Sequence, residues 1–286
     1  MNYAALIQNR KSVREFRDKV VPFRLLDQVK QYYRNSVRRL VPEIRTELYF
    51  FGTDAREALE GAAGYHSFLV GAPQYLVLLS EDHPQAHLNA GFVMEDLILK
   101  LTELELDSCW VTFTSSDWVK EALGLESDLQ VAAIAAFGYG VKTTRRLRLN
   151  IRSMSDIDIS AKRHYFEPKR SVRDLVHRDT WGNQDGLDNV IGFYDDMLWE
   201  SFYAASLAPS YLNRQAYGFL LEGGSVTLVS TPDRYNVPID RDLSLGIVLH
   251  HFTVVSENWA GKLSWRFDPV DAELPEGHSA VASAAI

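Results

Sequence analysis

The stretch GFVMEDLILKLTELELDSCW, residues 91–110, is matched without gaps by GIVLHHFTVVSENWAGKLSW, residues 246–265. Glycine aligns with glycine at one end and tryptophan with tryptophan at the other, at an offset of 155 residues. In both stretches the apolar residues recur at the spacing of an amphipathic helix. Each stretch therefore predicts a helix followed by a short buried strand, Cys109–Phe113 in the first and Ser264–Phe267 in the second. The repeat indicates that the chain contains two copies of one unit.

Outside the repeat, helix and strand patterns alternate along the chain. Helices are predicted at Tyr3–Asn9, Phe23–Asn35, Gly91–Leu104, Asp117–Leu123, Leu187–Leu207 and Leu243–Asn258, and strands at Gln74–Leu79, Gln130–Gly138, Ala216–Leu221 and Ser225–Ser230. This mixture predicts the α+β class, with helices flanking a central mixed or antiparallel sheet. We expect a first copy at residues 1–155 and a second at 156–286, tightly packed. Residues 141–168 read as an arm between the copies, and the tail from Asp271 as a mobile end.

Composition limits the function classes. The chain has 286 residues, 46% of them hydrophobic, which is enough for a sizeable core. A net charge of −8 argues against general nucleic-acid binding. No signal peptide and no apolar run of membrane-spanning length is recognisable, so we expect a cytoplasmic protein with no membrane partner. The single cysteine, Cys109, lies in an apolar run and is predicted to be a core residue.

Two short motifs carry candidate chemistry. In RKSVREF, residues 10–16, the alternation of Arg10, Ser12 and Arg14 points these side chains the same way if the segment is extended. Two guanidinium groups and a hydroxyl suit a phosphate, because arginine binds phosphate oxygens in a fork. The alternative is a basic helix terminus with no ligand.

The second motif is APSYLNRQAY, residues 208–217. Pro209 fixes its own φ angle, and Ser210 and Asn213 are residues that favour turns, so the segment predicts a rigid loop after a long helix. Such a loop can offer Ser210 and Asn213 as polar contacts to a planar ligand. The alternative is the ordinary end of a helix.

Taken together, the motifs resemble the hallmarks of nitroreductase-like FMN flavoproteins. RKSVREF is similar to the opening of that family, and APSYLNRQAYGF to its second motif. Three further segments agree: Gly71-Ala72-Pro73 before QYLVLL, the strand around Cys109 and Trp110, and the stretch LGLESDLQVAAIAAFGYG. Glu105 stands where the family usually has glycine. KRSVRDLVHRDTW, residues 169–181, resembles either the late basic arm of the family or a second copy of RKSVREF.

The order of the motifs departs from the common family pattern, in which they lie close together and FMN sits between two subunits. Here they lie in opposite halves of the chain, which resembles the single-chain, two-repeat branch of the family. The resemblance implies a nitroreductase-like fold in which two fused copies form an intramolecular pseudo-dimer. We therefore expect a monomer that binds one FMN between its copies.

The resemblance also assigns candidate site residues. The cofactor-binding set is Arg10, Lys11, Ser12, Arg14, Tyr65, His66, Val111, Thr112, Phe113, Lys169, Arg170, Pro209, Ser210 and Asn213. Arg14 and Thr112 are the catalytic candidates. Arg14 would stabilise the negative charge of reduced flavin, and a backbone N–H near Thr112 would approach its reactive nitrogen. The further candidates for the phosphate are Arg145, Arg146 and Arg148. No metal site is expected; His83 and His87 lack further ligands.

The implied activity is an FMN-dependent oxidoreductase. A small-molecule donor, with NAD(P)H as one possibility, would reduce the flavin and leave, and a small electron-poor acceptor would then take the electrons. Two alternatives stay open. One is a biosynthetic flavin-dependent dehydrogenase or oxidase on the same fold. The other is a non-catalytic flavin-binding protein or a scaffold without a cofactor.

Overall fold

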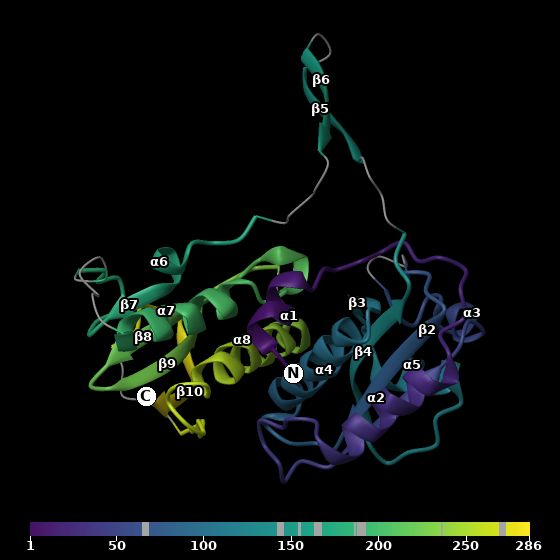
Figure 1. Cartoon of the computed structure of the whole chain (residues 1–286), viewed down its shortest axis with the longest axis horizontal. Helices are drawn as coiled ribbons and strands as arrows, with labels where there is room; N and C mark the ends of the chain where they lie inside the picture. The colour runs from purple at the N-terminus through teal and green to yellow at the C-terminus, as the bar shows by residue number, and fades with distance from the viewer. Residues whose placement is uncertain are drawn as a thin grey trace.

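The computed structural model describes residues 1–64, 69–141, 146–153, 156–162, 168–185, 187, 193–235, 237–268 and 273–286. It places two sheets at opposite ends of the molecule, with two long helices side by side between them (Figure 1). The class is α+β, as predicted.

The first half builds a sheet that is covered on both faces. Its elements are α1 (Tyr3–Asn9), α2 (Phe23–Asn35), β1 (Thr46–Phe51), α3 (Ala55–Leu59), β2 (Gln74–Ser80), α4 (Ala86–Glu103), β3 (Asp107–Val111), α5 (Ser116–Leu123) and β4 (Gln130–Gly138). Among the described residues the strand order is β1-β2-β4-β3, with each pair antiparallel. Leu76 and Leu78 of β2 pack with α2 and α4, whereas Val77 and Leu79 pack with α3 and α5. This alternation explains why QYLVLL has no polar face.

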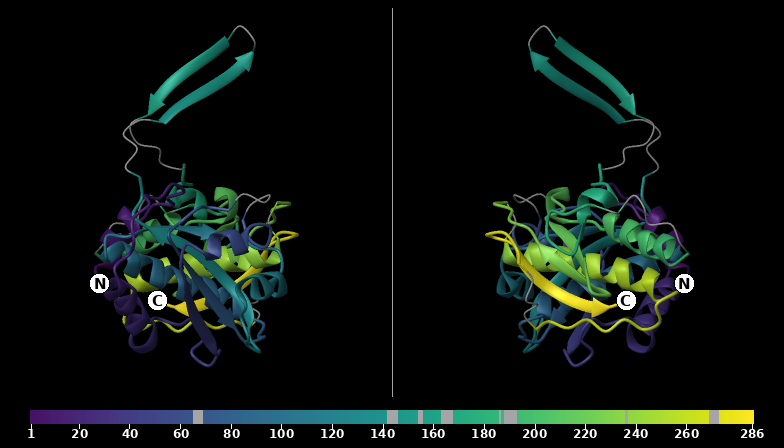
Figure 2. Two further views of the ribbon diagram at one scale, coloured as in Figure 1. Left: turned by 90° about the vertical axis from the view of Figure 1, so that its right-hand side faces the viewer. Right: turned by 90° about the vertical axis from the view of Figure 1, so that its left-hand side faces the viewer.

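The second half is smaller and begins after a hairpin. The hairpin strands β5 (Arg146–Ser153) and β6 (Asp156–Lys162) project from the body (Figures 1 and 2). The elements that follow are α6 (Val172–Leu175), β7 (Val176–Arg178), α7 (Phe193–Ser206), a 3₁₀ turn at Tyr211–Asn213, β8 (Tyr217–Glu222), β9 (Ser225–Ser230), α8 (Pro238–Ser256) and β10 (Ser279–Ala285). In the described part of this half the strand order is β10-β9-β8-β7, and β7 runs parallel to β8.

Three strands of each sheet correspond, whereas β7 has no counterpart among the described strands of the first sheet. β8, β9 and β10 occupy the places of β1, β2 and β4, since β9 pairs antiparallel with β8 on one side and β10 on the other. The counterpart of β3 is reduced to one antiparallel bridge between Arg266 and Ser283, closed by hydrogen bonds of 2.8 and 2.9 Å. The repeat found in the sequence is thus visible in the sheet topology as well as in the helices.

The long helices α4 and α8 meet at two glycines that align in the repeat. A Cβ atom on Gly91 would lie 2.3 Å from the carbonyl oxygen of Leu243, and one on Gly246 would lie 2.1 Å from that of Leu88. Leu88 and Leu243 are themselves equivalent in the repeat. The two contacts therefore exchange when the copies are exchanged, which is the relation expected across the two-fold axis of a pseudo-dimer.

Several sequence predictions need correction. Ser264–Phe267 does not form a strand, apart from the bridge at Arg266. The tail from Asp271 is not a mobile end: residues 279–285 form β10, which pairs with β9 and buries Ala282 and Ala284. The arm at 141–168 contains the β5–β6 hairpin, which its weak pattern did not predict. β1, β7, α3 and α6 were also not predicted.

Candidate functional site

The basic motif forms an extended strap along the open edge of β3. Ser12 makes a parallel bridge to Ser108, and the Val13 N–H donates to the Ser108 carbonyl at 2.8 Å. Further on, Phe16 bridges to Gly140 beyond the end of β4. A Cβ atom on Gly140 would lie 2.7 Å from Asp107 Oδ2, so the absence of a side chain there allows this close approach. The predicted extended conformation of RKSVREF is therefore present.

Arg10 turns inward from the end of α1. Its side chain is 8% exposed, and Nε lies 3.4 Å from the fully buried Oε1 of Glu95 on α4. Nη1 lies 3.5 Å from Ser12 Oγ. Nε has no hydrogen-bond partner within the described parts of the chain. Arg14, by contrast, is exposed. The charges of both arginines act to lower the pKa of the Cys109 thiol, although burial raises it overall.

The segment that follows β3 lies beside the residues that precede Tyr65. The carbonyl of Thr112 accepts a hydrogen bond of 2.7 Å from the Gly64 N–H, and Phe113 bridges to Ala63. Thr112 is half-buried, whereas Val111 and Phe113 are buried. Cys109 is also buried, as predicted for a core residue. The roles of Val111, Thr112 and Phe113 toward a flavin stay predictions.

The second motif is a tight turn held by its own polar groups. Ser210 Oγ accepts from the Gln215 N–H at 3.0 Å, and the Asn213 N–H donates to the Ser210 carbonyl at 2.9 Å. Leu212, Asn213 and Gln215 all have φ angles near +50°. Residues other than glycine rarely adopt this left-handed conformation, and such strain is typical of functional turns. The rigid loop predicted from Pro209, Ser210 and Asn213 is therefore present.

Lys169 and Arg170 hold this turn from outside. Lys169 Nζ donates to the Ala208 carbonyl at 2.7 Å and to Asn213 Oδ1 at 3.2 Å. The Arg170 N–H donates to Gln215 Oε1 at 2.8 Å, and its guanidinium to the Tyr217 carbonyl at 3.1 Å. These contacts favour the late-arm interpretation of KRSVRDL, since the same segment leads through α6 into β7 on the second sheet. A direct phosphate contact from either cation stays a prediction.

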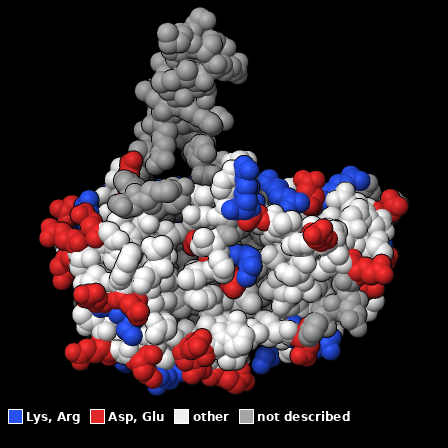
Figure 3. All heavy atoms as spheres, turned by 180° about the vertical axis from the view of Figure 1, so that it is seen from behind, with Lys and Arg blue, Asp and Glu red and all other residues white. Residues whose placement is uncertain are grey.

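The two motifs start from neighbouring helix ends. Ile7 of α1 and Ala204 of α7 share one apolar cluster, against which Leu6 and Leu207 also pack. Arg10 follows directly after α1, and Ala208 lies two residues beyond the end of α7. Figure 3 shows Lys and Arg side chains near the middle of one face, below the projecting hairpin. The segments that the sequence analysis expected to cooperate thus leave the body from one region.

A buried chain of contacts connects Arg10 with α7. Glu95 Oε1 lies 3.0 Å from His251 Nε2, and His251 Nδ1 lies 3.0 Å from the Ala204 carbonyl. The indole N–H of Trp110 donates to the other oxygen of Glu95 at 3.0 Å. Burial raises the pKa of Glu95, but the hydrogen bond from His251 and the charge of Arg10 outweigh burial and hold this pKa below its ordinary value.

A second buried pair lies beside the first. His250 Nε2 is 3.0 Å from Asp96 Oδ1, and Asp96 also accepts from the hydroxyls of Tyr3 and Tyr32 and from the Arg38 N–H. Because Glu95 aligns with His250, and Asp96 with His251, the two acid–histidine contacts exchange when the copies are exchanged. His250 and His251 were not among the candidate site residues predicted from the sequence. In the aligned repeats, two acids occupy the same positions as the two histidines, and this alignment was the signal that could have identified the contacts.

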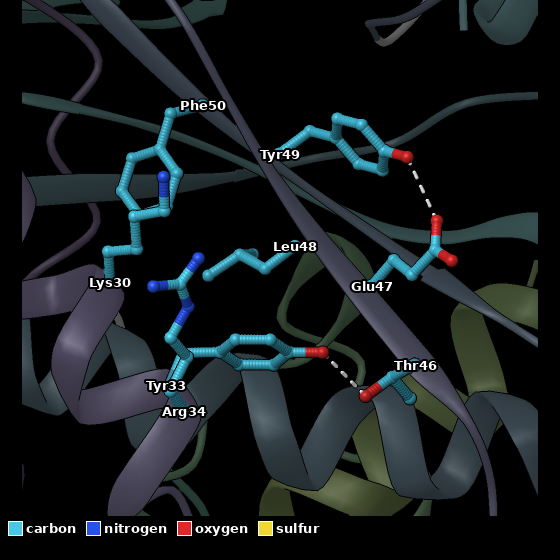
Figure 4. A pocket seen from close by; sticks show the side chains of 8 residues that line it. All are labelled: Lys30, Tyr33, Arg34, Thr46, Glu47, Leu48, Tyr49 and Phe50. Atoms are coloured by element: carbon cyan, nitrogen blue, oxygen red, sulfur yellow. Dashed lines mark hydrogen bonds between the residues drawn. The ribbon is translucent and has the colours of Figure 1, made fainter. Parts of the chain in front are cut away.

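Two hollows were found elsewhere on the surface. One, of about 270 Å³, lies between α2 and β1 (Figure 4). Among its lining residues, the hydroxyl groups of Tyr33 and Thr46 share a hydrogen bond of 2.8 Å, and the Tyr49 hydroxyl donates to Glu47 at 2.9 Å. The other, of about 250 Å³, is lined by Trp199, Phe202 and neighbouring residues of the second half. Neither is lined by a residue of the predicted cofactor set.

Some predicted residues cannot be placed. Tyr65, His66 and Arg145 lie outside the described residues, as do the side chains of Arg146 and Arg148 on β5. Within the described part of the chain, no group of three or more His, Cys, Asp or Glu residues is arranged to hold a metal ion. None of the helices described is long and apolar enough to cross a membrane.

Structural comparison shows similarity over the whole chain. A crystal structure from Thermotoga maritima, described as that of a "putative nitroreductase", covers 100% of this chain and 94% of its own, at 19% identity and a TM-score of 0.58. A nitroreductase family protein from Clostridium difficile covers 50% of this chain and 87% of its own, at 23% identity and a TM-score of 0.42. A nitroreductase with bound FMN from Bacteroides fragilis covers 56% of this chain and 100% of its own, at 17% identity and a TM-score of 0.44. Comparison with curated proteins found no match.

The family profile extends further than either motif. Residues 2–256 match the profile described as "Putative TM nitroreductase", a range that includes the basic strap, both long helices and the turn after α7. The predicted resemblance is thereby confirmed, and the chain belongs to this nitroreductase family.

Proposed function

We propose that the protein is an FMN-dependent oxidoreductase with one flavin bound where its two halves meet. The observation that carries this proposal is the buried line of contacts from Arg10 through Glu95 and His251 to Ala204. It joins the start of the first motif to α7, which ends two residues before Ala208. Family membership supports the oxidoreductase class.

The residues at this junction fit an anionic, phosphate-bearing cofactor. Arg10 has a buried Nε without a hydrogen-bond partner among the described residues, and Arg14 is exposed on the same strap. Guanidinium and hydroxyl groups are the usual partners of a phosphate. Ser12 lies between the two arginines, so we assign the phosphate to Arg10, Lys11 and Ser12. Pro209, Ser210 and Asn213 are assigned to the opposite side of the ring.

The chain contributes placement and electrostatics. Bound FMN would supply the capacity to accept and release two electrons. Arg14 would stabilise negative charge on the ring, and the backbone around Thr112 would orient the ring against the end of β3. Lys169 and Arg170 keep the turn at Ser210 in shape through the carbonyls of Ala208 and Tyr217. Tyr65 and His66 remain candidates for the other edge of the ring.

The proposal places both sides of the site on one chain, so a monomer suffices. The two copies are assigned to residues 1–155 and 156–286, with the boundary between β5 and β6. β7 then belongs to the second copy by sequence and lies at the far edge of its sheet. Light scattering on the purified protein should give the mass of one chain.

The first experiment is an absorption spectrum of the purified protein, followed by FMN titration of any protein without flavin. Bands of bound flavin, or saturable FMN binding, would support the proposal. A protein that neither carries nor binds FMN would contradict it and favour the scaffold without a cofactor. Anaerobic bleaching by NAD(P)H would indicate a reductase. Bleaching by an organic substrate alone would favour the dehydrogenase or oxidase.

Variants test the residue assignments. The double variant R10A/S12A should release FMN, and R14A should weaken FMN binding roughly tenfold, as expected from losing one favourable charge. Arg17 is exposed on the same strap but outside the assigned set, so R17A is the matched control. Equal flavin retention in R10A/S12A and R17A would contradict the phosphate assignment.

A further inference from the structure

The two ring nitrogens of His251 both face acceptors. Nδ1 is 3.0 Å from the Ala204 carbonyl oxygen, which can only accept, and Nε2 is 3.0 Å from Glu95 Oε1. Neutral imidazole carries one N–H, so it can satisfy only one of these contacts. The other contact requires a second proton, either on His251 or on Glu95.

The surroundings of Glu95 place that proton on His251. Trp110 donates to one carboxylate oxygen, and Arg10 lies 3.4 Å from the other. Both contacts favour the ionised carboxylate, in agreement with the lowered pKa of Glu95. Burial, the largest effect, holds the pKa of His251 below its ordinary value, and the charge of Arg10 acts in the same direction, while Glu95 opposes both. The count of donors decides between these opposing effects, because without the second proton two acceptors would meet at 3.0 Å inside the core.

The neighbouring pair has a different proton count. His250 Nε2 contacts Asp96, but His250 Nδ1 is buried with no hydrogen-bond partner in the described parts of the chain. A single N–H on Nε2 makes the contact to Asp96, and a second proton on Nδ1 would have no acceptor among the described residues. Asp96 receives its other hydrogen bonds from Tyr3, Tyr32 and Arg38. The geometry makes His250 neutral and Asp96 ionised, so the two symmetry-related pairs differ by one proton.

We infer that His251 is a buried imidazolium that shares the Glu95 carboxylate with Arg10, and that this positioning residue keeps Arg10 available to an anionic ligand. With His251 charged, Arg10, Glu95 and His251 together carry one net positive charge. With His251 neutral and Glu95 ionised, the charges of Glu95 and Arg10 would cancel. The identity of the ligand rests on the proposed function, whereas the charge of His251 does not.

The charge of His251 can be measured directly by ¹⁵N NMR of the imidazole rings in the full-length protein. We expect both nitrogens of His251 to carry protons at neutral pH and His250 to show one protonated and one bare nitrogen. A bare nitrogen on His251 at pH 7 would overturn the inference. This measurement needs no variant and no bound flavin.

The effect on the ligand is tested by FMN titration of three variants, with inorganic phosphate as a second probe. H251F should bind FMN roughly tenfold more weakly, because Glu95 then cancels Arg10. H250F is the matched control, since it removes a buried histidine that carries no charge, and its affinity should be unchanged. E95Q/H251F should regain affinity, because Arg10 is again without a counterion.

The outcomes separate this inference from the proposed function. Equal weakening in H251F and H250F, or no recovery in E95Q/H251F, would show a merely structural role. If the wild-type protein binds neither FMN nor phosphate, the proposed function fails, and the NMR result still decides the charge of His251. If H251F does not fold, the NMR measurement on the wild-type protein still decides the charge of His251.

Discussion

Gly91 on α4 lies against the backbone of Leu243 on α8, and Gly246 on α8 lies against the backbone of Leu88 on α4. The two contacts are equivalent, because the repeat aligns Gly91 with Gly246 and Leu88 with Leu243. Two helices can approach this closely only where neither carries a Cβ atom at the crossing point. The central interface of the molecule is thus built on a reciprocal pair of residues that the repeat places 155 positions apart.

We expect G91A and G246A each to destabilise the fold by about 3 kcal/mol, near the upper end for overpacking a core. The added methyl would overlap a backbone carbonyl, which cannot rotate away as a side chain could. Urea unfolding of each variant measures the loss. S256A is the control, because it also changes one buried position of α8. Ser256 Oγ has no hydrogen-bond partner among the described residues, so removing it breaks no contact of that kind. Equal stability of G91A and S256A would contradict the close approach.

E105G should stabilise the protein by about 0.5–1 kcal/mol. Glu105 has a φ of 59° at the end of α4, where the N–H of Leu106 donates back to the Leu101 carbonyl at 2.9 Å. Glycine adopts this conformation without strain, which explains why the family usually has it here. Thermal unfolding measures the gain. Replacing Glu103, the last residue of α4, by glycine should instead lower the melting temperature, because glycine has a low helix propensity and the ion pair with Lys100 is lost.

D240N should stabilise the protein at pH 8 but not at pH 4. Burial raises the pKa of Asp240 to about 6, above its ordinary value of 3.8. The unfolded chain therefore ionises first as pH rises, and stability falls between these two pKa values. Asparagine removes this loss, and the gain above pH 6 should be on the order of 1–2 kcal/mol. D242N, at a more exposed position of the same helix, is the control substitution.

D96N should cost about 3 kcal/mol at neutral pH, since it removes an ionised acceptor of several buried donors. Burial raises the pKa of Asp96, but the hydrogen bonds from His250 and the Arg38 N–H help to lower it below the ordinary value. A lowered pKa in the folded state gives stability that is present above about pH 4 and is lost as pH falls further. The free energies of unfolding of D96N and of the wild-type protein should therefore converge in acid. A constant difference between them would argue that shape, not charge, matters at this position.

The sequence predicted the elements whose patterns are strong. The boundaries of β4 and β9 agree with the structure residue for residue, because each has a clear apolar pattern. β10 was missed because Ala282, Ser283 and Ala284 have low strand propensity. They form a strand because β9 offers a pairing partner and because the pairing buries Ala282 and Ala284. Such a tertiary cause leaves no local signal.

The site shows the same division. The extended strap at Arg10 and the turn at Ser210 follow from local residue types. The link between them through Glu95 and His251 depends on two helices meeting, which no local pattern records. Only the gapless alignment of the repeats contained the information, since it placed a pair of acids over a pair of histidines.

The crossing of the chain between its halves constrains how the protein could be divided. α1 packs against α7 and α8 of the second half, and the connection through the β5–β6 hairpin leads to β7 at the edge of the second sheet. Fragments separated within the hairpin would each expose a long apolar helix face that only the other fragment covers. Co-expressed, they should reassociate into a heterodimer, whereas either fragment alone should aggregate.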